Sequence, residues 1–364
     1  MNSFVDVRTP ADPTSSTPPP GPAQRAAAKR TTHHVLLAVL ALGTALVIGA
    51  VLIAASDQRV LDALPYFLSR PSDALDAIWT SVAEAYGALF TGAIFDPSAV
   101  GGQQLQPLWS TISYATPLTL AGLAVAVAFR AHLFNIGVQG QIIFGGVLAA
   151  YVGFAWSLPG VLHLPVAVVA AVVAAGIWAG VAGLLKSALG APEVITTIML
   201  NYVAVYFLDF LLNQAAFRRP GRTDPVSPEV AKSAWVPDLL PGGGVLPLSF
   251  VMALVVAGAV WWLVERTPFG FKLRLLGANP SAARVAGVRI PSVQLIIMFV
   301  SGGLAGLAAA AQVLGNTHTL TSGVAGNLGW DAITVALLGR NHPLGVVAAA
   351  LLFGSLRAGG LNMQ

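Results

Sequence analysis

The chain has 364 residues, of which 56% are hydrophobic and only 9% are charged. A soluble domain carries about a quarter charged residues. With a mean hydropathy of +0.76, this composition excludes a water-soluble enzyme and predicts a polytopic membrane protein. The absence of cysteine excludes disulfides, thiolate metal sites and cysteine nucleophiles. The net charge of +4 is small, and the sequence shows no basic pattern typical of nucleic-acid binding.

The N-terminal residues differ from the rest of the chain. Residues 1–34 contain a polar, proline-rich stretch, Ala11–Gln24, which predicts a disordered cytoplasmic tail. Three basic residues follow it, and Val35–Ala55 is then a run of 21 uncharged residues. As a helix this run is about 31 Å long, enough to cross a bilayer. We therefore expect an uncleaved first span with the N-terminus in the cytoplasm.

Residues 35–364 are predicted to form an all-α transmembrane bundle with interrupted helices. Residues 56–107 are an acidic connection containing one helical segment, 73–90, placed on the outer surface. The apolar runs that follow predict about eight spans or part-spans. These runs are Leu108–Phe129, Ile142–Trp156, Leu164–Leu185, Val194–Leu212, Leu246–Val264, Val293–Leu314, Ala332–Leu338 and Leu344–Leu356.

The loop 265–292 carries five basic residues and one acidic residue, which indicates the cytoplasmic side. The loop 213–245 then falls outside, although its four basic residues oppose that side. Small residues four apart, as in the run GGLAG at 302–306, are expected to pack helices closely.

Polar residues interrupt the apolar pattern at His132–Gly146, where Asn135, Gln139 and Gln141 accompany several glycines. Such backbone is tolerated at membrane depth only inside the protein or beside water. The segment is either part of a solute path or a simple turn between two spans, and composition does not separate the two.

A second polar group lies in the run Gly190–Phe210. Glu193 stands at the start of an apolar helix, where the helix dipole favours an acid, so capping alone could explain it. Thr197 and Asn201 are four residues apart and share a face. That face can hydrogen-bond a polar solute or a neighbouring helix.

A third segment, Thr267–Pro291, contains the elements of a short capped helix. Asn279 is a good N-cap, Pro280 suits the first helical position, and Gly287 can take the left-handed C-cap. We predict a helix over Pro280–Ala286 that docks on a partner; the alternative is a solvated basic loop.

A fourth segment, Gly329–Gly360, places Asp331 and Arg340 on either side of a half-span, with His342 in a turn. Charges at such positions are a functional hypothesis by default. The six histidines show no ligand spacing, so no metal site is expected. The sequence also contains no GxxxxGK[ST], GxSxG or HExxH motif, so we expect neither an ATPase nor a hydrolase in this chain.

Four motifs in order resemble the permease subunits of bacterial ABC importers that serve branched-chain amino acids, simple sugars and nucleosides. They are FNIGVQGQ at Phe134–Gln141, EVITTIMLNY at Glu193–Tyr202, TPFGFKLRLLGANPSAARVAG at Thr267–Gly287 and ALLGRNHPLG at Ala336–Gly345. Within that family the chain is most similar to the nucleoside (basic membrane protein-associated) permeases. The resemblance covers residues 108–364.

The resemblance implies a multi-pass subunit of the bacterial plasma membrane that conducts a small polar solute inward. It implies a separate ATPase that binds ATP, a second permease and a lipid-anchored binding protein, with no cofactor in this chain. Amide and hydroxyl groups would contact the solute, and the capped helix would be the coupling helix. The implied path residues are Asn135, Gln139, Gln141, Glu193, Thr197 and Asn201. The implied coupling residues are Gly277, Asn279, Pro280, Ala282, Ala283, Arg284 and Gly287.

Two positions depart from the family pattern. Gln139 stands where the family often has Glu, and the chain ends where the family continues with further helices, so the permease domain is expected to be incomplete at its C-terminus. Three alternatives stay open. The first, within the same class, is a simple-sugar or branched-chain amino acid ABC permease. An ion-coupled secondary transporter would use Glu193, Asp209 and Asp331 as proton or ion sites, and a membrane scaffold would show no solute dependence.

Overall fold

The computed structural model describes residues 40–41, 43–101, 103–239 and 247–363, which form two compact units divided after Ala85. The predicted tail, residues 1–34, and the start of the first expected span lie outside the described residues.

The first unit contains the helix Gly43–Ser56, α2 (Gln58–Ala63), a 3₁₀ turn at Leu64–Tyr66 and the first part of α3 (Pro71–Ala93), which continues into the second unit. The helix Gly43–Ser56 and the segment Gln58–Tyr66 meet at 70°. The bend falls at Asp57, whose carboxylate accepts a hydrogen bond from the Arg59 amide and caps α2. The prediction of a helix over 73–90 is confirmed by α3.

The second unit is a helical bundle, and no strand occurs in the described residues beyond two isolated bridges. The helices that follow α3 are α4 (Gln106–Arg130), α5 (Val138–Ala155), α6 (Gly160–Leu189), α7 (Glu193–Leu212), α8 (Leu248–Arg266), α9 (Pro268–Ala278), α10 (Pro280–Val285), α11 (Ile290–Ala310), α12 (Leu328–Leu338) and α13 (Pro343–Leu361). Short 3₁₀ turns lie at Gln103–Leu105 and Lys232–Ala234, and α11 continues as a π-helix over Ala311–Thr317.

Seven helices of the described chain are long and apolar enough to cross a membrane, or eight if the bent pair of the first unit counts as one span. The prediction of an all-α polytopic bundle is therefore confirmed. Most predicted spans match a helix within a few residues, but α13 runs to Leu361, five residues beyond the predicted end. The predicted run stopped before Arg357, a charged residue that the helix accommodates beside a pocket.

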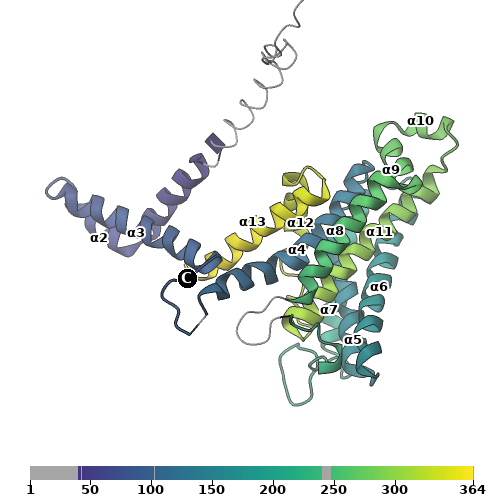
Figure 1. Cartoon of the computed structure of the whole chain (residues 1–364), viewed down its shortest axis with the longest axis horizontal. Helices are drawn as coiled ribbons and strands as arrows, with labels where there is room; N and C mark the ends of the chain where they lie inside the picture. Colours follow the sequence, from purple (N-terminus) through teal and green to yellow (C-terminus); the bar gives the residue numbers. More distant parts are fainter. Residues whose placement is uncertain (1–39, 42, 102, 240–246, 364) are drawn as a thin grey trace, which may run out of the picture. The chain divides into compact units, whose positions relative to one another are not determined.

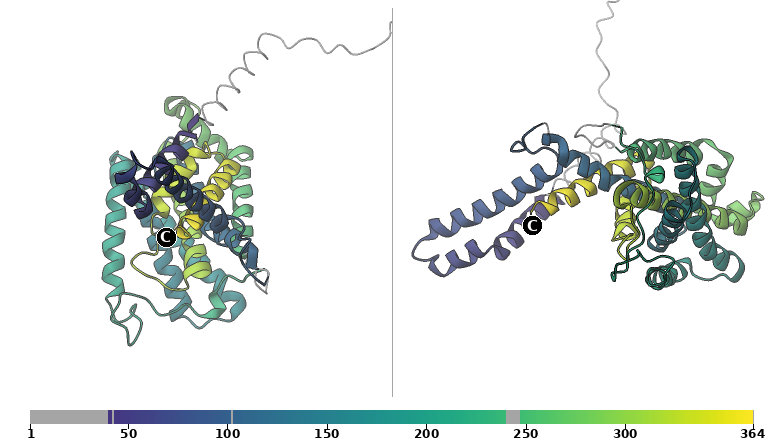
Figure 2. Two further views of the ribbon diagram at one scale, coloured as in Figure 1. Left: turned by 90° about the vertical axis from the view of Figure 1, so that its left-hand side faces the viewer. Right: turned by 90° about the horizontal axis from the view of Figure 1, so that it is seen from below.

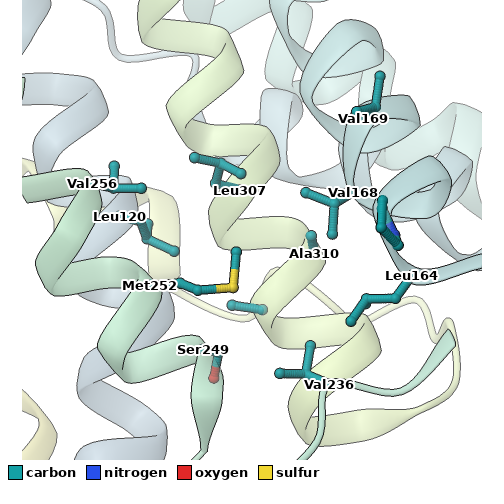
Figure 3. Close-up of a pocket in the computed structure, with 12 residues that line it drawn as sticks. Leu120, Leu164, Val168, Val169, Val236, Ser249, Met252, Val256, Leu307 and Ala310 are labelled. Carbon is teal, nitrogen blue, oxygen red and sulfur yellow. The ribbon is translucent and has the colours of Figure 1, made fainter. Parts of the chain in front are cut away.

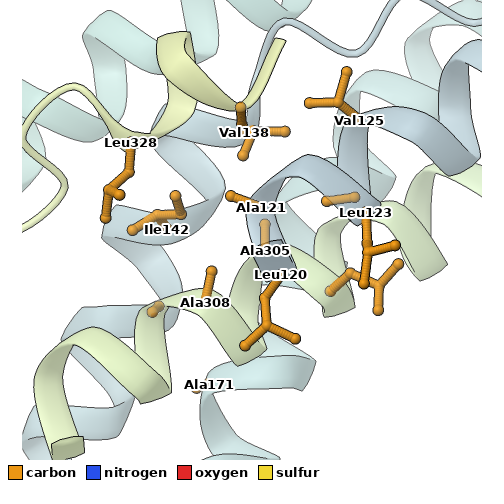
Figure 4. Close-up of a cluster of buried hydrophobic side chains, with 14 of the residues drawn as sticks. Leu120, Ala121, Leu123, Val125, Val138, Ile142, Ala171, Ala305, Ala308 and Leu328 are labelled. Atoms are coloured by element: carbon orange, nitrogen blue, oxygen red, sulfur yellow. The ribbon is translucent and has the colours of Figure 1, made fainter. Parts of the chain in front are cut away.

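The core of the second unit is built mainly from α4, α5, α6 and α11, where alanines pack beside leucine, valine and isoleucine side chains (Figure 4). Among these four helices, α11 and α6 approach each other closely. A methyl group added at Gly302 or Gly306 would lie 2.4 Å from the backbone oxygen of Ala175 or Ala171. The predicted packing role of the 302–306 glycines is confirmed, because only a missing side chain allows this approach.

The two ends of the bundle differ, as Figure 1 and the two views of Figure 2 show. α9 and α10 project beyond α8 and α11 at one end. At the other end, the segment between α7 and α8 is bonded to the segment that follows α11. The Ser227 amide donates to the Leu320 carbonyl at 2.9 Å, and the Val236 amide donates to the Leu314 carbonyl at 3.0 Å. The bundle thus has a helical end and a loop end.

Candidate functional site

The polar residues of the α4–α5 turn form a closed cluster of side-chain amides. Asn135 and Gln141 are fully buried and bond to each other twice, at 2.9 and 3.1 Å. Asn135 Nδ2 also donates to Ser301 Oγ of α11 at 2.8 Å, and Ser301 Oγ donates to the Ala124 carbonyl of α4 at 2.6 Å. The Gly137 amide donates to Asn135 Oδ1 at 3.0 Å. We call Asn135, Gln141 and Ser301 the amide cluster; it joins α4, α5 and α11.

α7 holds the same turn from its other side. Asn201 accepts a hydrogen bond from the Gly140 amide and donates one to the Ile136 carbonyl, both at 2.9 Å. Thr197 donates to the Glu193 carbonyl of its own helix at 2.7 Å. A methyl group at Gly137 would lie only 3.0 Å from Thr197 Cβ, so the glycine permits α7 to approach. The shared face predicted for Thr197 and Asn201 is confirmed, and it packs on α5.

Glu193 lies at the first position of α7 and forms an ion pair with Lys186 at the end of α6, at 2.5 Å. The acid therefore lies at the favourable end of its helix dipole and also closes the α6–α7 turn.

Gln139 connects α5 to the start of α12. Its Nε2 donates to the Gly326 carbonyl at 2.7 Å, and its Oε1 accepts from the Gly329 amide at 2.9 Å. One orphan amide of the first turn of α12 is thus satisfied from another helix. A methyl group at Gly329 would lie 2.4 Å from the Gln139 nitrogen, so the two backbones are in contact.

Five of the six predicted path residues thus lie together around the α4–α5 turn, and Glu193 lies beside them on α7. In this conformation the amides of Asn135 and Asn201 bond to protein groups, and a solute would have to replace those bonds. Contact with a solute stays a prediction for these six residues.

A different set of polar residues borders open space. A cavity of about 390 Å³ lies between α4, α12 and α13. It adjoins a second cavity of about 350 Å³, and both are lined by Tyr114 of α4. The first is lined by Tyr114, Leu118, Asn327, Leu328, Asp331, Phe353, Gly354, Leu356 and Arg357. We call the two cavities together the α4–α13 pocket.

Two charged side chains that line the α4–α13 pocket form no ion pair with the described residues. Neither Asp331 nor Arg357 has an ion-pair partner within 4.0 Å among the described residues. The Arg357 guanidinium lies over the ring of Tyr114, 5.3 Å from its centroid. A carboxylate, a guanidinium and an aromatic ring at one cavity can bind a polar solute that has a flat ring.

Sequence reasoning missed Tyr114, Asn327 and Arg357 as site residues and treated Asp331 only as a proton or ion site. The signal for Arg357 was present, because it is a lone charge in an apolar helix. No sequence spacing predicts its contact with Tyr114, which lies far away in the chain.

The coupling segment is folded as predicted. α10 begins at Pro280, and Asn279 Oδ1 accepts from the Ser281 and Ala282 amides at 2.9 and 3.1 Å. Gly287 has φ +80°. Ala283 is fully buried, whereas Arg284 and Val285 are exposed. Docking on an ATPase stays a prediction for α10.

The sequence did not predict α9, the helix before α10. Its signal was the pair Thr267–Pro268: the Gly270 amide donates to Thr267 Oγ1 at 3.1 Å, and proline holds the first helical position. Gly277 serves packing here, since a methyl group on it would lie 2.2 Å from the Arg130 oxygen of α4.

An ion-pair cluster ties α9 to the bundle. Glu265, near the end of α8, accepts from Arg130 of α4 and from Arg274 of α9. Arg130 Nε also donates to the Asn341 carbonyl at 2.9 Å, in the turn between α12 and α13. Arg130 and Glu265 thus connect α9 to the turn between α12 and α13.

Comparison with known proteins places residues 108–364 in the family described as "Branched-chain amino acid transport system / permease component". The chain is 37% identical over 284 residues to the guanosine ABC transporter permease protein NupP of Bacillus subtilis, covering 78% of this chain and 79% of that one. It is 33% identical to the glucose ABC transporter permease protein TsgB13 of Haloferax volcanii (80% and 77% covered). It is 30% identical to the nucleoside ABC transporter permease protein NupB of Lactococcus lactis (76% of each chain). No solved structure matches the chain. The chain belongs to this family of ABC transporter permeases, multi-pass membrane subunits that are not enzymes themselves.

Proposed function

We propose that the chain is the permease subunit of an ABC importer that conducts nucleosides inward across the plasma membrane. The observation that carries the proposal is the similarity to guanosine and nucleoside permeases over three quarters of the chain. It favours an ABC importer over the ion-coupled alternative.

The α4–α13 pocket supplies chemistry that suits a nucleoside. Its larger cavity of about 390 Å³ lies in the range of roughly 300–1,000 Å³ typical of small-molecule sites. Tyr114 offers a ring face to a base, and Arg357 offers donors to ring acceptors. Asp331 and Asn327 offer acceptors to ribose hydroxyls. These contacts are few, as a conductor that must release its solute requires.

A simple sugar is the second candidate solute, because the glucose permease of Haloferax volcanii is 33% identical to the chain. A sugar would use the carboxylate and amide groups of the pocket but has no flat aromatic ring to stack on Tyr114. The dependence of uptake on the aromatic ring at position 114 therefore separates the two solutes.

We propose that the energy for transport comes from ATP bound by a separate ATPase that receives α10. Arg284 is exposed on α10 and could pair with an acid of that subunit. The proposed assembly also contains a second permease and a binding protein outside the membrane, with the N-terminus and the 265–292 loop in the cytoplasm.

The test is uptake of radiolabelled guanosine and glucose by cells that express the chain with its ATPase, second permease and binding protein. Tyr114→Leu should lower guanosine uptake about tenfold, the loss of roughly 1.4 kcal/mol of stacking, while Tyr114→Phe keeps most of it. Uptake of glucose but not of guanosine would show that the solute is a sugar. Uptake that does not require the ATPase would contradict the assignment as an ABC importer.

Coupling is tested with Arg284→Glu on α10 and a matched charge reversal, Lys272→Glu, at an exposed position of α9. We expect Arg284→Glu to abolish ATP-dependent uptake and Lys272→Glu to retain it. An equal loss of ATP-dependent uptake in both variants would mean that the positive charge of this surface, rather than docking through α10, explains the effect.

A further inference from the structure

An apolar cavity of the second unit lies away from the α4–α13 pocket. It has a volume of about 390 Å³ and lies between α4, α6, α8 and α11. Eleven of its twelve lining residues are apolar, as Figure 3 shows for most of them. They include Val168 and Val169 of α6, Met252 and Val256 of α8 and Ala310 of α11, and Ser249 is the polar member. We call this cavity the α6–α8 pocket. A polar solute would lose its hydration there without gaining hydrogen bonds.

Ser249 is the exception in this lining. Its side chain is 5% exposed, and its Oγ has no hydrogen-bond partner among the described residues. A buried hydroxyl without a partner costs free energy unless a ligand or water satisfies it. The pocket therefore suits a ligand with a long apolar body and one hydrogen-bond acceptor.

The depth of the pocket identifies where such a ligand comes from. Ser249 is the second residue of α8 and lies at the loop end, at the boundary of the membrane span. Val256, seven residues further into α8, also lines the pocket. At 1.5 Å per residue the pocket reaches about 10 Å into the span, which is within one leaflet of a hydrocarbon core about 30 Å thick.

The mouth of the pocket faces outward. Val169 on α6 is 59% exposed and Met252 on α8 is 40% exposed. α6 packs mainly on α11 and α5, whereas α8 packs mainly on α4 and α9, so the two helices flank an opening rather than a contact. Both exposed side chains are apolar and lie within spans, so we expect lipid at this opening.

We propose that the α6–α8 pocket binds one acyl chain of a glycerophospholipid from the leaflet at the loop end, with Ser249 donating to its ester carbonyl. The hydroxyl lies at the start of the α8 span, where the ester groups of a bilayer are expected, and the apolar lining continues about 10 Å inward, within one leaflet. A helix of a second copy would run the whole height of the span rather than stop within one leaflet. The proposal does not depend on which solute is transported.

The test uses the full chain in vesicles that contain phosphatidylethanolamine with a photoactivatable diazirine in the middle of its acyl chain. Labelled positions are mapped by mass spectrometry, and labelling of the exposed face of α7 at Tyr206 serves as the internal standard. We expect labelling at α6 and α8 pocket positions in the wild-type chain.

Two substitutions fill the pocket from different helices, Val168→Phe on α6 and Ala310→Leu on α11. Each should lower pocket labelling at least fivefold. Val173→Phe, at an exposed position of α6 outside the pocket, should leave it unchanged. Each variant must first elute as a single species, and the second filling variant keeps the test valid if the first does not fold. Pocket labelling unchanged in a folded filling variant would overturn the proposal, as would the absence of labelling at the pocket positions of the wild-type chain.

The role of Ser249 is tested by comparing an ester-linked probe with an otherwise identical ether-linked probe. Ser249→Ala should lower labelling by the ester-linked probe roughly threefold, within the range for one hydrogen bond, and should not change labelling by the ether-linked probe. An equal fall with both probes would overturn the hydrogen bond to the ester.

Discussion

The amide cluster and the α4–α13 pocket both place polar side chains inside a membrane bundle, yet they treat them in opposite ways. In the cluster, Asn135 and Gln141 satisfy each other and bind Ser301, so that three helices are held together. In the pocket, Asp331 and Arg357 have no ion-pair partner among the described residues and border open volume. We therefore expect the amide cluster to hold the helices together and the polar residues of the α4–α13 pocket to contact a solute.

The largest effect should come from breaking the frame. Asn135→Leu removes four hydrogen bonds, and the side chains of Gln141 and Ser301 lose Asn135 as a partner. Each buried polar group left unpaired costs roughly 1–3 kcal/mol of folding free energy. We expect a marked fall in thermal stability of the purified chain, with uptake falling in proportion to folded protein.

The control is Gln214→Leu, which removes an exposed amide after α7 and should leave stability within about 0.5 kcal/mol. If Asn135→Leu keeps wild-type stability and selectively loses solute affinity, Asn135 contacts the solute and does not hold the helices together.

The next effect sharpens the comparison from the pocket. Arg357→Met removes a guanidinium that no described carboxylate pairs with, so folding should be nearly unchanged. Uptake affinity should fall about 10–100-fold, as expected for a lost hydrogen bond to a charged group. The measurement is the concentration dependence of guanosine uptake beside a thermal unfolding curve. Arg357→Lys keeps the charge but not the planar fork and should be intermediate.

The contrary result is a large loss of stability in Arg357→Met with unchanged affinity of the protein that remains folded. It would show that Arg357 stabilises the bundle and does not contact the solute.

The sequence predicts local features of this molecule well and distant ones poorly. The spans follow from apolar length, and α10 follows from Asn279, Pro280 and Gly287, because each signal lies within a few residues. The contact of Tyr114 with Arg357 joins α4 to α13 and leaves no local pattern. The six predicted path residues came from polarity within motifs, which does not reveal whether a side chain already has its partners.

Gln139 connects the two regions, since it lies at the start of α5 near the amide cluster and bonds to Gly326 and Gly329, on either side of Asn327. Gln139→Ala should loosen the start of α12 and lower uptake about three- to tenfold, the range for one or two net hydrogen bonds. Assembly with the ATPase should persist, because α10 packs on α9 and α11 and the affected contact joins α5 to α12.

Co-purification of the ATPase with Gln139→Ala measures assembly directly. Lost co-purification would contradict this assignment, whereas Gln139→Glu, which keeps the acceptor for the Gly329 amide, should retain more uptake than Gln139→Ala.

The smallest effect concerns a polar group outside both regions and outside the spans. His318 stacks on Trp235 at 3.9 Å between ring centroids, and its Nδ1 is buried without a partner among the described residues. Burial lowers the pKa of His318, although the charges of Glu229 and Asp238 act in the opposite direction.

As the pH falls below the ordinary histidine pKa of about 6.5, the unfolded chain binds a proton at this position before the folded chain does. Stability should therefore fall as the pH decreases from about 6.5 toward the folded pKa. His318→Gln should flatten this part of the profile of melting temperature against pH. An identical slope in wild type and variant would assign the pH dependence to other groups, and a rise in stability on acidification would mean that the two carboxylates outweigh burial.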